Sequence, residues 1–406
     1  MQAYSHISIA IPMLAEMEAL PQLLECLNNQ SFRNFSVYVC VNNPEEWWDN
    51  PSTMVQCKEN MEAIKILQSC KDFPITVIDK ASKGKGWQGK KRGVGWARKL
   101  LFEEILQRES ADELIVSLDA DTEFAYNYLQ SVWKRMNNNP AVSALAVPYY
   151  HHLVDDESQN RALLRYEIYM RYYMLQMLAI GNPYAFTALG SAMVFSSKAY
   201  VRAGGITPLQ GGEDFYLMQK FVKTGKVLLY NDQGVYPSGR KSKRVPFGTG
   251  PAVSKELQEQ EASYPFFPMD AYKNVEQTFE TFPRLYTDEL LTPMTCFLQN
   301  QLKTDDLWSA LRRNYKKKDL FVKACEERVD GLRILQYLKQ EYEKRNPKKY
   351  SSEGYLLEYC HKEGMDIGDD FSFMLSDISV LNDLRNRLYD KEMLQRKQRD
   401  IQNNAF

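Results

Sequence analysis

Two carboxylates one residue apart, Asp119 and Asp121, carry the clearest chemical signal in the sequence. They follow residues 114–118, a largely apolar run with the length and composition of a strand buried on both faces. Side chains at positions i and i+2 of an extended chain point the same way, so we expect both aspartates to project from the carboxyl end of this strand, where open α/β sheets bind ligands. Like charges this close need a cation or strong donors, and a hard divalent ion carrying a diphosphate would satisfy them. The alternative is a simple turn that ends the strand.

A basic, glycine-rich stretch at residues 80–93 has the composition of a phosphate-binding loop. The spacing of its glycines matches the dinucleotide fingerprint, but the stretch follows a third strand instead of a first one. It also resembles a P-loop, which we reject because Lys91 stands where that loop needs Ser or Thr. Flexible backbone, clustered positive charge and a helix N-terminus remain, and together they favour an anion. A solvated basic loop is the alternative.

A second pair of carboxylates, Glu213 and Asp214, follows two glycines at the predicted start of a helix. Acidic side chains in a first helical turn are stabilised by the exposed N–H groups, so one interpretation is a plain helix cap. The other interpretation is a general base held in a cleft. A second basic, glycine-rich loop follows at residues 238–250 and contains Arg240.

The residues around these motifs alternate between strand and helix patterns. We predict strands at residues 7–11, 35–41, 74–79, 114–118, 142–149, 190–195 and 227–230, with Pro12 stopping the first. Apolar residues recur at helical spacing in segments between them, including residues 20–27, 61–67, 94–105 and 213–222. This order predicts an α/β fold with a Rossmann-like, mostly parallel mixed sheet and helices on both faces. Polar residues that end the strands, such as Asn42, Asp79 and Asp119, should then gather along one edge of the sheet.

The pattern changes near residue 263, after which prolines punctuate the chain and helical periodicity dominates. We therefore predict an α/β domain at residues 1–262 and a mostly helical C-terminal extension at residues 263–406, with long helices at 319–345 and 376–396. Residues 158–180 form a helix rich in Tyr and Met, for which a core role is favoured over a wall for a ring-shaped ligand. His151 and His152 are interpreted as surface residues and not as ligands.

Composition narrows the classes of function. Hydrophobic residues make up 44% and charged residues 25% of the 406-residue chain, as in a globular protein. The net charge of −1 gives no global field, so no nucleic-acid partner is expected. Seven scattered cysteines and an N-terminus without signal-peptide features favour a reducing, cytoplasmic location. No apolar run approaches the ~18 residues of a membrane span, although the basic cluster at residues 312–318 leaves peripheral association with the inner face of a membrane open.

In their order and spacing, four motifs of residues 1–262 resemble those of glycosyltransferase family 2, whose members have the GT-A fold. The motifs are Ile9-Ala10-Ile11-Pro12 with Glu16, Asp79 followed by Gly84-Lys85-Gly86 and Arg92, Asp119-Ala120-Asp121, and Glu213-Asp214. The chain looks like a bacterial transferase that uses a nucleotide sugar.

This resemblance implies roles for the matched residues. The nucleotide base and ribose would be held by Pro12, Glu16, Asn42 and Asp79. Asp119 would lie near the ribose and the metal, and Asp121 would bind Mn²⁺ or Mg²⁺ directly. Asp214 would be the catalytic base, with Glu213 beside it. The cationic loop with Gly84, Lys85 and Arg92 would lie beside the donor, and Arg240 would hold the diphosphate where some relatives place a metal-binding histidine.

The expected function is metal-dependent, inverting transfer of one sugar from a UDP- or GDP-sugar to a hydroxyl of a glycan, lipid-linked or small-molecule acceptor. The Gln-x-x-Arg-Trp signature of processive synthases is absent from the sequence. One alternative is a sugar-phosphate nucleotidyltransferase, although Pro12-Met13-Leu14-Ala15 is not the Gly-x-Gly-Thr-Arg signature of that class. A non-catalytic nucleotide-sugar-binding protein is the other alternative.

Overall fold

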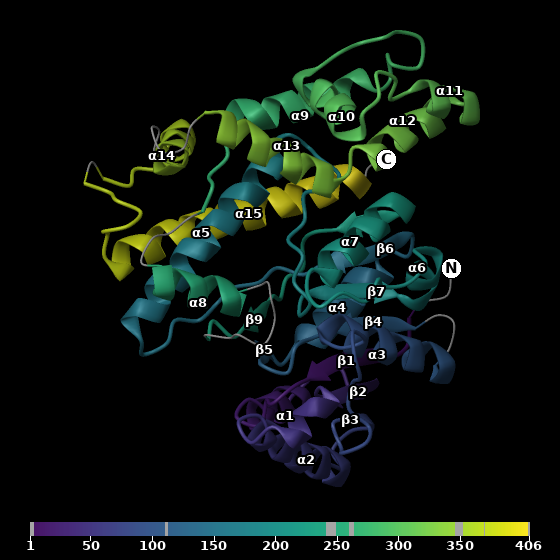
Figure 1. Ribbon diagram of the computed structural model, residues 1–406, viewed down its shortest axis with the longest axis vertical. Helices are drawn as coiled ribbons and strands as arrows, with labels where there is room; N and C mark the ends of the chain where they lie inside the picture. The colour runs from purple at the N-terminus through teal and green to yellow at the C-terminus, as the bar shows by residue number, and fades with distance from the viewer. Residues whose placement is uncertain are drawn as a thin grey trace. The chain divides into compact units, whose positions relative to one another are not determined.

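The computed structural model describes residues 4–109, 113–240, 249–259, 264–345, 352–368 and 370–404 (Figure 1). The chain divides into two compact units. The first contains residues 1–163, 186–258 and 400–406, and the second contains residues 164–185 and 259–399. The domain boundary expected after residue 262 stays a prediction, and the compact units differ from it in assigning residues 164–185 to the second unit and residues 400–406 to the first.

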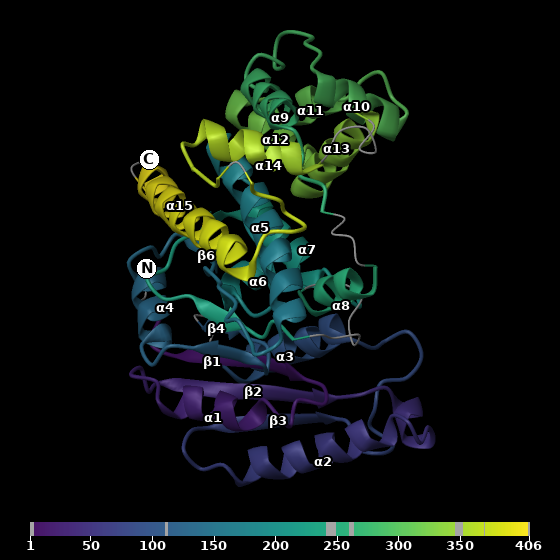
Figure 2. The ribbon, with the colours of Figure 1, turned by 90° about the vertical axis from the view of Figure 1, so that its left-hand side faces the viewer.

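A mostly parallel mixed sheet forms the centre of the first unit, as predicted. Its strands run in the order β3-β2-β1-β4-β7-β6-β8, and β7 alone among these is antiparallel to its neighbours. Figure 2 shows β1, β2 and β3 lying side by side. The strands are β1 (Ile7–Met13), β2 (Phe35–Asn42), β3 (Ile75–Lys80), β4 (Leu114–Ser117), β6 (Val142–Ala146), β7 (Met193–Ser196) and β8 (Lys226–Leu228).

Helices cover both faces of this sheet because the strands are apolar on both sides. Leu114 and Val116 of β4 pack into one core with apolar residues of three helices, whereas Phe195 of β7 contacts Phe102, Tyr200 and Phe221 on the other face. The first group of helices is α1 (Leu20–Asn28), α2 (Met54–Ser69) and α4 (Tyr128–Asn137). The second group is α3 (Val94–Arg108), α6 (Ser197–Arg202) and α7 (Glu213–Thr224).

Each of these seven strands ends one to three residues from its predicted end, as for the strand predicted at 142–149, which ends at Ala146, and two of the differences bear on the site. Pro12 lies inside β1, because β1 pairs with β4 only as far as Ala10 and a residue beyond that point can lack a ladder N–H. The strand before the aspartates ends at Ser117, and the N–H of Thr122 donates to the carbonyl of Asp119. Asp119 and Asp121 therefore belong to a turn and not to an extended strand end, so the prediction that they project together as alternate residues of a strand is wrong.

A second, two-stranded sheet joins the residues after this turn to a distant segment. The strand β5 (Thr122–Phe124) is antiparallel to β9 (Val235–Pro237), and Thr122 lies opposite Pro237. This register brings the turn before Thr122 close to the residues after Pro237.

The second unit is helical. Tyr172 contacts Phe266, Tyr272 and Tyr359, which confirms a core role for the Tyr- and Met-rich helix. The expected helix at 319–345 is two helices, because Asp330 accepts a hydrogen bond from the N–H of Arg333 and caps the second. The remaining helices of the chain are η1 (Glu45–Asp49), α5 (Glu157–Ala179), α8 (Thr249–Glu259), α9 (Met269–Thr281), α10 (Pro293–Leu302), α11 (Ser309–Asn314), α12 (Lys318–Arg328), α13 (Gly331–Lys344), α14 (Ser352–Lys362) and α15 (Ile378–Asn404).

Two buried arginines hold α5 to α15 inside the second unit, and a third, Arg396, pairs within α15. Arg171 pairs with Glu392, Arg385 pairs with Glu167, and Arg396 pairs with Glu392. In the described part of the chain, none of the helices combines the length and the apolar character needed to cross a membrane.

Candidate active site

A cavity of about 490 Å³ opens in the first unit at the carboxyl ends of the parallel strands. This is the edge where open α/β sheets bind ligands. Nine of the residues predicted to act in the site line it: Pro12, Glu16, Asn42, Arg92, Asp119, Asp121, Glu213, Asp214 and Arg240. The other three, Asp79, Gly84 and Lys85, are not among its lining residues.

Arg98, which also lines the cavity, joins the two carboxylate motifs. Its guanidinium contacts Oδ1 of Asp119 at 2.5 Å and also pairs with Glu213. Arg98 and Glu213 are almost fully buried, whereas Asp119 is partly exposed. Burial alone would lower the pKa of Arg98, but Asp119 and Glu213 outweigh it and raise that pKa, so the guanidinium stays charged.

Sequence reasoning missed Arg98, although a signal was present. Arg98 falls beside Ala97 and three residues before Leu101, inside the apolar stripe of α3. A charged residue in such a stripe is almost never buried without a partner. Gly190 provides the room, because a Cβ there would collide with the Arg98 guanidinium.

Asp214 lies deep in the cavity in the first turn of α7. Its backbone position is set by Gly212, whose φ of 77° places it in the left-handed region that glycine adopts most readily. The Asp214 residue is partly buried and lines the cavity. Burial raises the pKa of the Asp214 carboxyl to about 7, with Glu213 adding to the rise and Arg98 opposing it.

Asp121 and Glu16 share one arginine at the rim of the cavity. The Arg240 guanidinium lies 2.9 Å from Oδ2 of Asp121 and also contacts Oε2 of Glu16. Burial opposes the charged form of Arg240, but Asp121 and Glu16 raise its pKa. Residues 241–248 of the second basic loop lie outside the described residues.

Asn42 and Trp87 form one end of the cavity. The Asn42 amide donates to the Met13 carbonyl at 2.9 Å, and its oxygen accepts from the Trp87 indole at 2.9 Å. Trp47 and Pro44 line the same cavity and were also missed, because a tryptophan in a short helix gives no signal in sequence. Asn42 thus holds the indole of Trp87 in place.

The glycine-rich loop binds an anion, but the anion is a side chain of the protein. The N–H groups of Gly84 and Gly86 each donate to the Glu45 carboxylate at 2.7 Å. Lys85 contacts Asp79 at 2.8 Å. Burial would raise the pKa of Asp79, but hydrogen bonds from Lys85, Ser82 and the backbone lower it to about 2.

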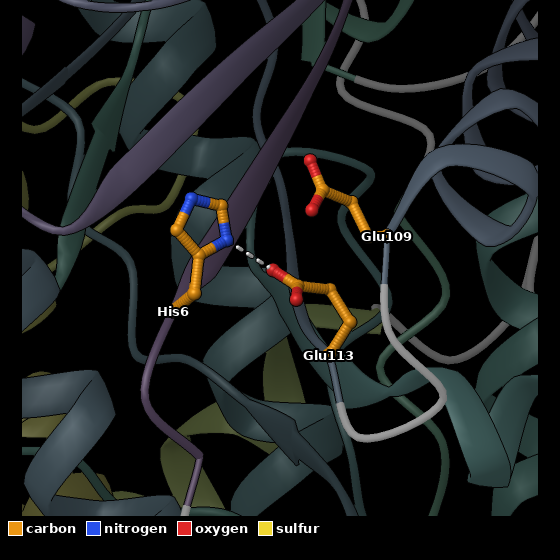
Figure 3. Close-up of side chains that lie close together, drawn as sticks. All are labelled: His6, Glu109 and Glu113. Atoms are coloured by element: carbon orange, nitrogen blue, oxygen red, sulfur yellow. Dashed lines mark hydrogen bonds and ion pairs between the residues drawn. The ribbon is translucent and has the colours of Figure 1, made fainter.

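One further cluster with metal-ligand chemistry lies outside the cavity in the described part of the chain. His6, Glu109 and Glu113 come together beside the start of β1, and Nδ1 of His6 lies 2.7 Å from Glu113 (Figure 3). Ser8 donates to the same Glu113 carboxylate at 2.9 Å, and Tyr38 donates to Glu109 at 2.5 Å. The cluster is explained by hydrogen bonding within the protein.

His151 is buried, so the expectation of two surface histidines was wrong for it, while His152 is exposed as expected. The His151 ring packs against Tyr149, and its Nε2 lies 3.3 Å from the Thr249 hydroxyl. These contacts explain why a polar ring is tolerated inside the protein.

Residues 8–200 match the family model described as Glycosyl transferase family 2. This segment holds β1 to β7 with Asp119 and Asp121, and it is a family 2 glycosyltransferase domain, which confirms the resemblance stated from the motifs. The protein therefore contains a glycosyltransferase domain. Glu213, Asp214 and Arg240 lie beyond the matched residues.

No curated protein matches the chain. Among solved structures, the chain is similar to residues 1–349 of TarS from S. aureus in complex with UDP-GlcNAc, at 12% identity and a TM-score of 0.41, over 92% of this chain and 98% of that one. It is also similar to the mannosyltransferase PcManGT from Pyrobaculum calidifontis in complex with GDP-Man and Mn²⁺, at 10% identity and a TM-score of 0.41, over 97% and 88% of the two chains. The family assignment rests on the family model.

Proposed function

We propose that the protein transfers one sugar from a UDP- or GDP-sugar to an acceptor hydroxyl, with a divalent cation and with inversion at the sugar carbon. The observation that carries this proposal is the cavity that brings Asp119, Asp121 and Arg240 together with Asp214. Asp119, Asp121 and Arg240 suit a diphosphate leaving group, whereas Asp214 suits an incoming hydroxyl.

The charges around the cavity fit a divalent cation. Five carboxylates and three arginines line it, so negative charge exceeds positive charge. Carboxylate oxygens are the ligands that Mg²⁺ and Mn²⁺ prefer. Asp121, with Asp119 beside it, would hold the ion, which supplies neutralisation of the diphosphate as it leaves. Arg240 and Arg92 would donate to the same diphosphate, because a guanidinium fork matches phosphate oxygens.

Asp214 suits the role of general base. A base works best when its pKa lies near the working pH, and burial raises the pKa of Asp214 to about 7. The acceptor oxygen forms a bond to the sugar carbon while its proton passes to Asp214. The bond from that carbon to the diphosphate breaks, and its electron pair leaves with the nucleotide. Attack opposite the leaving group inverts the configuration.

A panel of UDP- and GDP-sugars, tested with and without Mn²⁺ or Mg²⁺, checks the proposal. A true donor at one hundred times its dissociation constant should stabilise the fold by about 2.7 kcal/mol, read from thermal unfolding. Asp121→Asn should remove the metal-dependent part of this stabilisation, and Asp214→Asn should keep donor binding but lose transfer. Full transfer by both variants, or release of pyrophosphate from a nucleoside triphosphate, would contradict the assignment.

A further inference from the structure

Arg240 contacts carboxylates from two other segments of the chain. It follows β9, and the pairing of Thr122 with Pro237 brings the segment after β9 to the turn that holds Asp121. Glu16 reaches the same guanidinium from the loop after β1, where Ala15 has a φ of 52°. A non-glycine residue in the left-handed region is strained, and such strain is typical of functional sites. Three separate segments thus converge on one charge.

We propose that Arg240 is an internal counter-cation, which neutralises Glu16 and Asp121 before the donor binds and moves to the donor diphosphate when it arrives. The inference rests on the proposed function, because it takes Asp121 as a metal ligand. It adds a prediction of order: the divalent cation binds weakly alone and tightly with a diphosphate.

The reason is the fixed charge of the guanidinium, which does not lose its proton in proteins. A divalent cation at Asp121 would meet a guanidinium 2.9 Å from the carboxylate oxygen that it needs. Two cations on one carboxylate repel each other strongly in a partly buried site. A diphosphate removes the conflict, because it offers the guanidinium oxygens of its own and leaves Asp121 to the metal.

Binding of Mn²⁺ to the full chain, followed by the paramagnetic resonance signal of free Mn²⁺, tests this directly. Arg240→Gln should bind Mn²⁺ alone about 5-fold or more tightly than the wild type, the lower end of the usual range of coupling between sites. Arg240→Lys keeps the charge and should retain weak binding. Arg92→Gln is the matched control, because Arg92 lines the same cavity but pairs with Glu46.

Nucleoside diphosphates chelate Mn²⁺ themselves, so UDP and GDP are added in a second series. The nucleotides should increase the Mn²⁺ affinity of the wild type by a larger factor than they increase the Mn²⁺ affinity of Arg240→Gln. Equal Mn²⁺ affinity of the wild type and Arg240→Gln, with and without nucleotide, would overturn the inference. An equal gain in Arg92→Gln would also overturn it, because the effect would then come from net charge.

Asp121→Asn separates this inference from the proposed function. If Asp121→Asn binds Mn²⁺ as the wild type does, the assignment of the metal ligand is wrong and both proposals fall. If it loses Mn²⁺ while Arg240→Gln behaves as the wild type, only the role of Arg240 is wrong.

Discussion

Removal of the Arg98 guanidinium should destabilise the first unit more than loss of any exposed ion pair. In Arg98→Gln, the carboxylate of Glu213, only 1% exposed, would stay buried without its partner, whereas Asp119 is 37% exposed at its side chain and can turn to water. Breaking a buried pair from one side costs about 3–5 kcal/mol. We expect a loss of this size, because most of the cost arises at Glu213.

Urea unfolding followed by tryptophan emission measures this loss, since five of the six tryptophans lie in the first unit. Arg108→Gln is the control on the same helix, because Arg108 pairs with Glu104 at the surface and should cost less than about 1 kcal/mol. Adding Glu213→Gln to Arg98→Gln should recover part of the lost stability. A cost for Arg98→Gln no larger than for Arg108→Gln would refute the reasoning.

Four further outcomes follow from the structure. Asp214→Asn should slow transfer by about 10²-fold or more. The kcat/KM of the wild type should rise with pH and level off above about 7, because Asp214 must lose its proton to act as the base. A flat pH profile from pH 5 to 8 would exclude Asp214 as the base. Because the folded state holds this proton more tightly than the unfolded chain, the free energy of unfolding should fall as pH rises from 4 toward about 7, and Asp214→Asn should make that slope smaller. Gly190→Ala, which sets a methyl group against the Arg98 guanidinium, should cost about 1–3 kcal/mol in urea unfolding, while Gly354→Ala, with open space around it, should cost nothing. Asp400→Asn should lower the free energy of unfolding by about 1.5–3 kcal/mol, because Asp400 accepts from the N–H of Leu229 and Tyr230 and pairs with Arg135. Asp390→Asn, on the exposed side of the same helix, is the control. Equal losses in the two variants would contradict the stabilising role of the Asp400 contacts.

The alternation of strands and helices was predictable, because it depends on local periodicity, and the motifs gave nine of the residues that line the cavity. The strands β1, β2 and β4 each carry an apolar run that is buried on both faces, so Asp119 had to emerge at the ligand-binding edge. The pairing of Arg240 with Asp121 was not predictable, because it depends on β5 and β9, which have three residues each and show no period.

Hydrogen-bond partners were the other feature that residue patterns did not reveal. Asp79 and Gly84 match the family motif, yet the structure directs Lys85 to Asp79 and Glu45 to the N–H of Gly84. Such pairings depend on the path of the loops after β2 and β3, which the sequence leaves undetermined. The role of Arg98 was missed because its partners, Asp119 and Glu213, lie 21 and 115 positions further along the chain, and residue patterns do not show such distant pairs.

The position of Asp400 also constrains how the protein folds during synthesis. The peptide groups at the end of β8 find their acceptor in a residue that the ribosome adds more than 150 positions later. The sheet can form early, but the N–H groups of Leu229 and Tyr230 after its edge strand β8 have no Asp400 acceptor until the whole helical unit has been synthesised. A protein truncated after residue 262 would lack Asp400 and would therefore leave the edge of the sheet at β8 unprotected. We expect such a protein to aggregate through that edge.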